Sequence, residues 1–107
     1  MTMAGVYSKE MTAAEVHKRL AKEKLYLVDV REQDEWEDGH IAGAVHIPLG
    51  QLGHRIQELP RDRELILVCR SGNRSGLACE YMEGIGYKVA NMAGGMLAWP
   101  GSVKTGR

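Results

Sequence analysis

The stretch that decides the fold of this chain is LILVCRSGNRS, residues 65–75. Its first four residues form a continuous apolar run, which is the pattern of a parallel strand covered on both faces. The run ends at Cys69, and a short polar loop with two arginines follows. A strand that delivers a thiol into such a loop, ahead of a helix, predicts an α/β fold with a nucleophile at the strand end.

On the N-terminal side of this stretch, the sequence predicts helices and strands in alternation. Thr12 and Glu15 form a capping box, which indicates that the first helix begins there. Apolar residues recur three or four apart up to Leu59, where Pro60 closes another helix. The predicted elements are a helix at about 12–22, a strand at 25–30, a short helix at 32–36, a short strand at 44–47 and a helix at 49–59.

On the C-terminal side, the loop leads into a helix predicted over 75–82, which Gly84 and Gly86 end. A strand over 88–92 and a last short helix over 96–99 follow. Because strands and helices alternate along the chain, the fold class is α/β with a mainly parallel sheet. Ligands of such sheets gather beyond the carboxyl ends of the strands, and Cys69 lies at such an end.

The composition, with 107 residues, 44% hydrophobic and 26% charged, suits one soluble domain over 1–107 with a core at about 9–101. Since the formal net charge is zero, no basic footprint indicates nucleic-acid binding. No apolar run approaches the about 20 residues that cross a bilayer, and residues 1–10 do not resemble a secretory signal. Two cysteines are too few for a disulfide framework, which favours a cytoplasmic location. We expect loose ends at 1–5 and 101–107.

The loop after Cys69 has the composition of an anion-binding site. Successive amide hydrogens can point inward in a tight turn, and Gly72 and Asn73 tolerate the positive φ that such a turn often needs. The helix that begins near Ser75 adds unpaired amides and the positive end of its dipole. These groups favour the thiolate of Cys69. The predicted anion-binding loop comprises Arg70, Ser71, Gly72, Asn73, Arg74 and Ser75.

The charged side chains of the loop favour an anionic ligand. Arg70 and Arg74 offer forked donors that suit sulfate-like or phosphate-like oxyanions. Cys79, in contrast, lies within the following helix among apolar neighbours, so we interpret it as core filling.

Three further groups outside the loop could support the site. Asp29 lies in an apolar strand, where a carboxylate needs partners; we expect it to hold the loop or to pair with an arginine. Arg31 and Glu35 are four residues apart, which predicts an ion pair. His40 and His46 have no third ligand nearby in the sequence, which argues against a metal site.

Five pieces of the sequence, in order and spanning about residues 9–101, resemble the single-domain rhodanese (thiosulfate sulfurtransferase) family. They are LVDVRE at 27–32, EW at 35–36, GHIAGA at 39–44 with IP at 47–48, CRSGNRS at 69–75, and GGM at 94–96 with Trp99. The resemblance implies a rhodanese-like, five-stranded sheet flanked by helices on both faces and a persulfide intermediate on Cys69. It also implies that the Gly94-Gly95 turn lies near the mouth of the site.

The spacing within the loop separates two chemistries. Arg74 is the fifth residue after Cys69, whereas phosphatases with a cysteine nucleophile typically have one more residue between the two. A transferring phosphoryl group has three equatorial oxygens to hold, while a persulfide needs room for one sulfur. The short loop therefore favours sulfur transfer over the alternative of a small phosphatase or an arsenate reductase.

We expect a two-step transfer that needs no metal or organic cofactor. Thiosulfate, or a similar small sulfur donor, gives its outer sulfur to Cys69, and cyanide or a thiol acceptor removes it. Two alternatives stay open: a non-catalytic module, and a carrier that delivers sulfur to a protein partner. The chemistry at Cys69 is the same in the carrier and in the enzyme.

Overall fold

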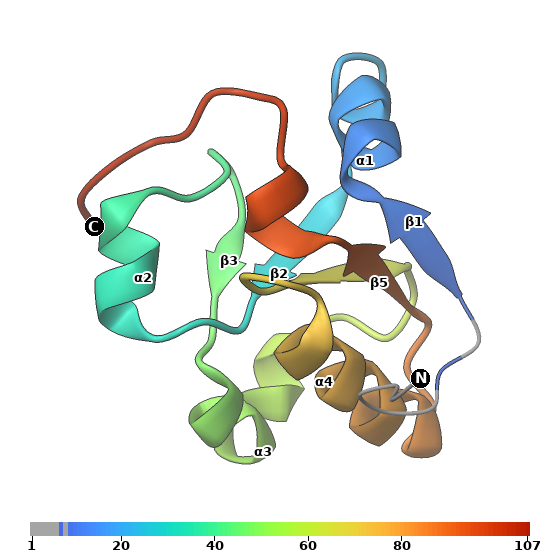
Figure 1. The fold of residues 1–107 in the computed structure, drawn as a ribbon. Coiled ribbons are helices and arrows are strands. Elements are labelled where there is room, and N and C mark those ends of the chain that lie inside the picture. The colour runs from blue at the N-terminus through green and yellow to red at the C-terminus, as the bar shows by residue number, and fades with distance from the viewer. Residues whose placement is uncertain (1–6, 8) are drawn as a thin grey trace.

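The computed structural model describes residue 7 and residues 9–107. The expectation for residues 1–5 therefore lies outside the described residues. Within them the sheet has five strands, all parallel, in the order β1-β5-β4-β2-β3 (Figure 1). The strands are β1 (Glu10–Thr12), β2 (Tyr26–Asp29), β3 (Val45–His46), β4 (Leu65–Val68) and β5 (Val89–Ala93).

The central strand β4 explains why the apolar run of the sequence is continuous. Leu65 and Leu67 point into one core cluster, and Ile66 and Val68 point into the other. Helices cover both faces of the sheet: α3 (Leu52–Arg55) and α4 (Asn73–Gly84) lie on one face, and α1 (Ala13–Leu20) lies on the other (Figure 1). The predicted fold class, with helices on both faces, is confirmed.

Several element boundaries differ from the predictions. The helix expected over 49–59 is divided into η1 (Leu49–Gln51), α3 and η2 (Ile56–Glu58), two 3-10 turns around one α-helical turn. Helix α4 begins at Asn73 instead of residue 75, directly after the left-handed Gly72 (φ 105°). The last short helix is the 3-10 segment η3 (Gly95–Ala98), and α2 spans Gln33–Asp38.

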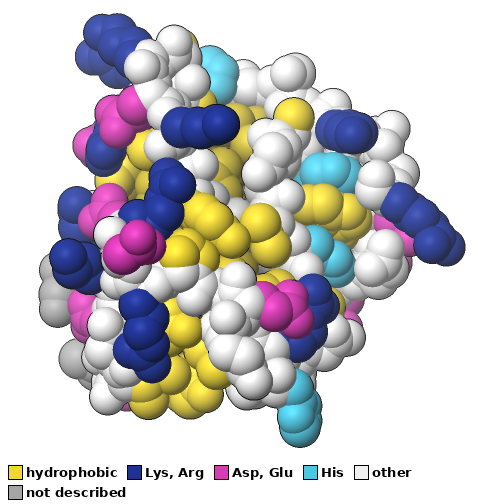
Figure 2. All heavy atoms as spheres, turned by 180° about the vertical axis from the view of Figure 1, so that it is seen from behind, with side chains coloured by type: hydrophobic (Ala, Val, Ile, Leu, Met, Phe, Trp, Pro, Cys, Tyr) yellow, Lys and Arg dark blue, Asp and Glu magenta, His cyan; other side chains and the backbone are white. Residues whose placement is uncertain are grey.

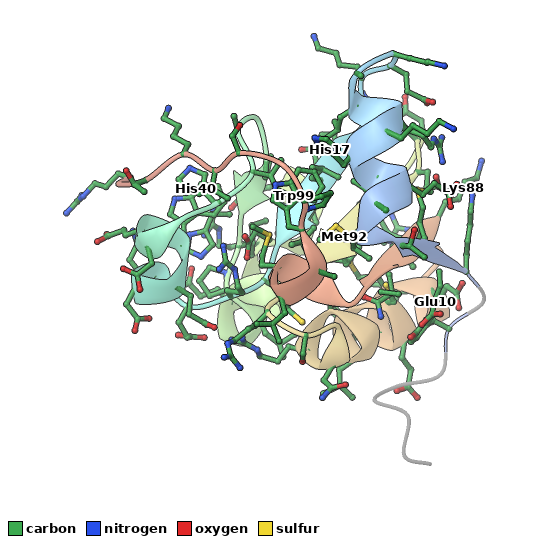
Figure 3. The ribbon with its side chains drawn as sticks, turned by 45° about the horizontal axis from the view of Figure 1, so that its top comes forward. Glu10, His17, His40, Lys88, Met92 and Trp99 are labelled. Carbon is green, nitrogen blue, oxygen red and sulfur yellow. The ribbon has the colours of Figure 1, made fainter. Side chains whose placement is uncertain are left out.

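The chain after η3 is held against the rest of the fold. The Trp99 ring meets the His17 ring of α1 edge-on, with centroids 5.2 Å apart (Figure 3). Lys104 and His40 exchange two backbone hydrogen bonds of 2.8 and 2.9 Å, and Gly106 N donates to Glu37 O. The expectation of a loose end at 101–107 is therefore wrong at these residues, because backbone pairing with the α2 region fixes the segment.

Figure 2 shows the face opposite to the view of Figure 1. Lys and Arg side chains alternate there with Asp and Glu, and hydrophobic atoms lie between them.

Among the described residues, no helix is both long and apolar enough to cross a membrane.

Candidate active site

Cys69 follows directly on β4, and its residue has no exposed surface. Among the described residues, two groups are within hydrogen-bond distance of its sulfur. The amide of Gly72 donates to Sγ at 3.0 Å, and the Ser75 hydroxyl lies 3.3 Å from it. The loop therefore curls back over the thiol, as the sequence predicted, and the left-handed backbone of Gly72 makes that turn possible.

Three carbonyl groups of the loop are bound from the side of β5 and η3. Because a peptide group is planar and trans, its N–H points away from its C=O. The amides of Arg70, Ser71 and Asn73 therefore face away from β5 and η3. The three bonds are Met96 N to Cys69 O (2.9 Å), Leu97 N to Arg70 O (3.0 Å) and Asn91 Nδ2 to Gly72 O (3.0 Å).

The amides of Arg70, Ser71 and Asn73 are available to a ligand. None of them donates a hydrogen bond within the part of the chain that the structure describes. The twelve-residue helix α4 begins at Asn73, within this loop, and adds the positive end of its dipole. This arrangement can stabilise a thiolate or an anion bonded to the sulfur.

The turn that carries η3 approaches the loop too closely for a side chain. A Cβ atom on Gly95 would fall on the carbonyl groups of Cys69 and Arg70. Gly94 and Gly95 both have positive φ, 83° and 57°. The glycine pair of the sequence thus lies directly against the nucleophile loop.

The two arginines of the loop differ. Arg74 makes a two-point ion pair with Glu35, with Nη1–Oε1 at 2.6 Å and Nη2–Oε2 at 2.7 Å. This pair raises the pKa of Arg74 and lowers the pKa of Glu35 to about 2. Arg70 is exposed, and its guanidinium has no partner among the described residues. Only Arg70 is therefore free to bind an oxyanion.

The predicted pair between Arg31 and Glu35 is wrong. Arg31 instead binds Asp29 through Nε and Nη2, at 2.8 to 3.1 Å, and its Nη2 also donates to Gly39 O at 2.8 Å. Both side chains of this pair are buried. Of the two roles expected for Asp29, pairing with an arginine is confirmed, while no hydrogen bond links its carboxylate to the loop within the described residues.

A buried hydrogen-bond network behind the loop was not predicted. Asn91 of β5 is 1% exposed and contacts both the loop and Ser75. Its Nδ2 also donates to the hydroxyl of Tyr7, which in turn donates to Glu10. The signal in the sequence was a single amide side chain within an otherwise apolar strand.

Cys79 lies inside α4 and is fully buried. Burial raises the pKa of its thiol to about 12. A thiol that stays protonated at neutral pH is a poor nucleophile, in agreement with the interpretation as core filling.

The two candidate histidines pack against one ring. The Trp36 ring stacks on the rings of His40 and His46, with centroid distances of 3.6 and 4.7 Å. His40 Nδ1 lies 2.7 Å from Trp36 O, and His46 Nε2 lies 2.7 Å from Arg31 O, so each nitrogen donates to a carbonyl. Among the described residues, no three His, Cys, Asp or Glu side chains gather as metal ligands would.

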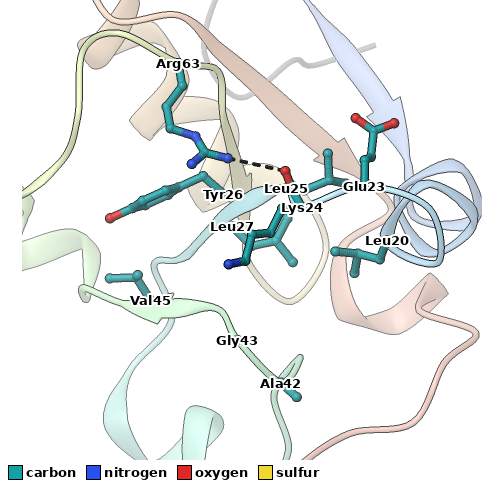
Figure 4. A pocket seen from close by; sticks show the side chains of 10 residues that line it. All are labelled: Leu20, Glu23, Lys24, Leu25, Tyr26, Leu27, Ala42, Gly43, Val45 and Arg63. Carbon is teal, nitrogen blue, oxygen red and sulfur yellow. Dashed lines mark hydrogen bonds between the residues drawn. The ribbon is translucent and has the colours of Figure 1, made fainter.

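A pocket of about 410 Å³ opens near the amino end of β2 (Figure 4). It is lined mainly by apolar residues with Lys24 and Arg63 among them, and Arg63 donates to Lys24 O. Cys69 follows the carboxyl end of the adjacent parallel strand β4, so this pocket lies toward the other end of the sheet. It contains neither of the two cysteines.

Comparison with known proteins agrees with this geometry. The profile of the family described as "Rhodanese-like domain" matches residues 12–102. A Bacillus subtilis protein named "Putative sulfurtransferase YtwF" is 42% identical, covering 90% of this chain and 94% of that protein. A "Sulfurtransferase" of Allochromatium vinosum is 39% identical, covering 84% and 86%. The crystal structure of a rhodanese-like domain protein from Staphylococcus aureus has a TM-score of 0.87 at 30% identity, covering 94% of this chain and 100% of that one.

Proposed function

The chain belongs to the rhodanese-like family of sulfurtransferases, and on that premise we propose that it moves a sulfane sulfur through a persulfide on Cys69. The observation that carries the proposal is the Gly72 amide hydrogen bond to Sγ at 3.0 Å, beside amides without other partners. Such donors stabilise both a thiolate and the terminal sulfur of a persulfide. The chemistry needs no metal or organic cofactor.

The first step charges the enzyme. The Cys69 thiolate attacks the outer sulfur of thiosulfate, a new S–S bond forms, and the S–S bond of thiosulfate breaks. The electron pair of that bond leaves with sulfite, so the total charge is unchanged. Arg70 binds the departing oxygens, because its guanidinium is free while that of Arg74 is paired with Glu35.

The second step discharges the enzyme. Cyanide or a thiolate attacks the outer sulfur of the persulfide and leaves as thiocyanate or a new persulfide, and the Cys69 thiolate is restored. Because Cys69 has no exposed surface, the groups that cover its sulfur must move aside for either substrate.

Intact-mass measurement tests the proposal. Mixing with thiosulfate should add one sulfur to the chain, and cyanide should remove it. Cys69→Ser should take up no sulfur, whereas Cys79→Ala should load as the unaltered chain does. A Cys69→Ser chain that loads fully would overturn the assignment, and turnover of a chromogenic phosphate ester by the unaltered chain would point to a phosphatase instead.

A carrier that delivers sulfur to a protein partner is the second candidate. The exposed side chain of Leu97 supports it: it is 65% exposed, and its amide is bonded to Arg70 O on the loop. An apolar side chain beside the loop suits contact with a protein surface. In that case Leu97→Asp should slow sulfur transfer to a protein thiol while leaving transfer to cyanide unchanged. If the variant transfers sulfur to the protein thiol at the rate of the unaltered chain, the contact is excluded.

A further inference from the structure

We propose that Asn91 is a positioning residue for sulfur transfer, because it holds the loop backbone so that its amides face the sulfur of Cys69. That this positioning serves sulfur transfer rests on the proposed function. That Asn91 positions the loop is argued from its hydrogen bonds alone. The hydrogen bonds of Asn91 go to Ser75, Tyr7 and Gly72 and not to Sγ, and its side chain is 1% exposed, so we place its action in the groups that it binds.

The orientation of the Asn91 amide is fixed by its partners. Nδ2 carries two hydrogens, and each finds an oxygen at 3.0 Å: the carbonyl of Gly72 and the hydroxyl of Tyr7. Oδ1 accepts from the hydroxyl of Ser75 at 2.5 Å. In the reversed orientation Oδ1 would face the carbonyl of Gly72, acceptor against acceptor. The side chain therefore has one satisfied orientation.

The bond to Gly72 acts on the loop directly. Gly72 O accepts from Asn91 Nδ2 and also from Gly76 N, each at 3.0 Å, so this carbonyl is held toward β5 and α4. The amide of the same peptide group, that of Asn73, points the other way. The preceding amide, Gly72 N, is the one that reaches Sγ. Fixing the carbonyl of Gly72 thus fixes the turn that presents these donors.

The bond to Ser75 competes with a second contact. The Ser75 hydroxyl has one hydrogen and two acceptors within reach, Asn91 Oδ1 at 2.5 Å and Sγ at 3.3 Å. Because Oδ1 is the nearer acceptor, Asn91 draws this hydrogen away from the sulfur. The thiolate then depends more on the backbone amides that Asn91 aligns than on the hydroxyl.

The outward branch of the network does not conduct protons from Cys69. Asn91 Nδ2 donates to Tyr7, and Tyr7 donates to Glu10 at 2.6 Å, but an amide gives up a proton too reluctantly to relay one. Orientation is therefore what Asn91 transmits. The branch also offers a matched control, because Tyr7→Phe removes one bond of Asn91 and leaves the two that lead to the loop.

The test measures how the rate of Cys69 alkylation by iodoacetamide depends on pH, in chains that carry Cys79→Ala so that one thiol reacts. The plateau rate reports access to the sulfur, and the pH midpoint reports how well the loop stabilises the thiolate. Ser75→Ala is added so that a freed hydroxyl cannot replace the amides. Arg74, the charged group that acts electrostatically on Cys69, stays unchanged in every chain, as does Glu35 of α2, its ion-pair partner.

In this background Asn91→Ala should move the midpoint up by about one pH unit, the size expected when one aligned donor to a charged group is lost. Tyr7→Phe should leave the midpoint in place. Equal midpoints for the two variants would overturn the proposal. If the Asn91→Ala chain does not fold, Asn91→Thr in the Cys79→Ala chain carries the test, since a β-branched residue suits a strand and is too short to bridge to Gly72.

Sulfur loading separates this proposal from the proposed function. The Asn91→Ala chain should take up less sulfur from thiosulfate than the Tyr7→Phe chain at neutral pH, by intact mass. If no chain, the unaltered one included, takes up sulfur from any donor, the proposed function fails. The alkylation midpoints still decide the role of Asn91 in that case.

Discussion

Arg74 and Glu35 join the start of α4 to α2 through two hydrogen bonds of 2.6 and 2.7 Å. The pair occupies the fork of one loop arginine, so its charge is already balanced by a carboxylate of the same chain. Two roles follow for this contact: it holds α2 against the nucleophile loop, and it leaves Arg70 as the free cation of the site.

The first prediction concerns the pH dependence of this pair. Arg74 lowers the pKa of Glu35 from 4.5 to about 2. Because the pKa is lower in the folded chain than in the unfolded one, the stabilisation is complete above about pH 4.5 and is lost as the pH falls toward 2. With both side chains partly exposed, Glu35→Gln should lower the free energy of unfolding at pH 7 by about 1–3 kcal/mol.

Urea unfolding of both chains between pH 7 and pH 3 measures this difference, which should shrink as the pH falls. Glu23→Gln is the control, because Glu23 pairs with Arg19 on the surface and should matter much less. A difference that stays constant across the pH range would contradict the role of the ion pair.

The second prediction concerns Arg70. If its free guanidinium binds the sulfonate oxygens of thiosulfate, Arg70→Ala should raise KM for thiosulfate by about tenfold, the effect of losing one charge-assisted contact. Added salt should produce the same trend in the unaltered chain, because an exposed charge is screened. Steady-state kinetics with thiosulfate and cyanide measure both effects. An Arg70→Ala enzyme with unchanged KM would show that the donor does not use this side chain.

The elements that the sequence predicted best are those whose pattern is local. The apolar run 65–68 matches β4 residue for residue, since a strand covered on both faces needs no alternation. The pattern of the sequence did not indicate strand β1. This strand has three residues, which are exposed, buried and exposed, and three residues are too few to establish a period of two.

The polar contacts of the site were predictable only in part, because tertiary partners override spacing. The rule for residues four apart suggested Arg31 with Glu35, whereas Glu35 pairs with Arg74, 39 residues away. Asn91 binds groups 16, 19 and 84 residues away, and no local rule connects them. Such pairs follow from the order of the strands, which brings β5 beside β4.

The third prediction compares two glycines with positive φ. A Cβ on Gly95 would fall on the carbonyl groups of Cys69 and Arg70, whereas one on Gly43 meets nothing within 4 Å. Gly43→Ala should therefore cost only the left-handed backbone, about 1–2 kcal/mol. Gly95→Ala adds a displaced η3 and should also abolish most sulfur transfer. Thermal unfolding and turnover per folded molecule test the pair, and a Gly95→Ala enzyme with normal turnover would show that η3 does not shape the loop.

The last prediction distinguishes the two thiols, both of which are fully buried. Burial raises the pKa of Cys79 to about 12, so at pH 8 about one molecule in ten thousand carries its thiolate. Iodoacetamide should therefore label native Cys69→Ser hardly at all, and rapidly once urea unfolds it. The Cys79→Ala chain should be labelled in its native state, because Cys69 lies in a loop whose Gly72 amide donates to its sulfur, whereas Cys79 lies within helix α4. Rapid labelling of native Cys69→Ser would mean that α4 opens readily and that Cys79 could exchange sulfur with the loop.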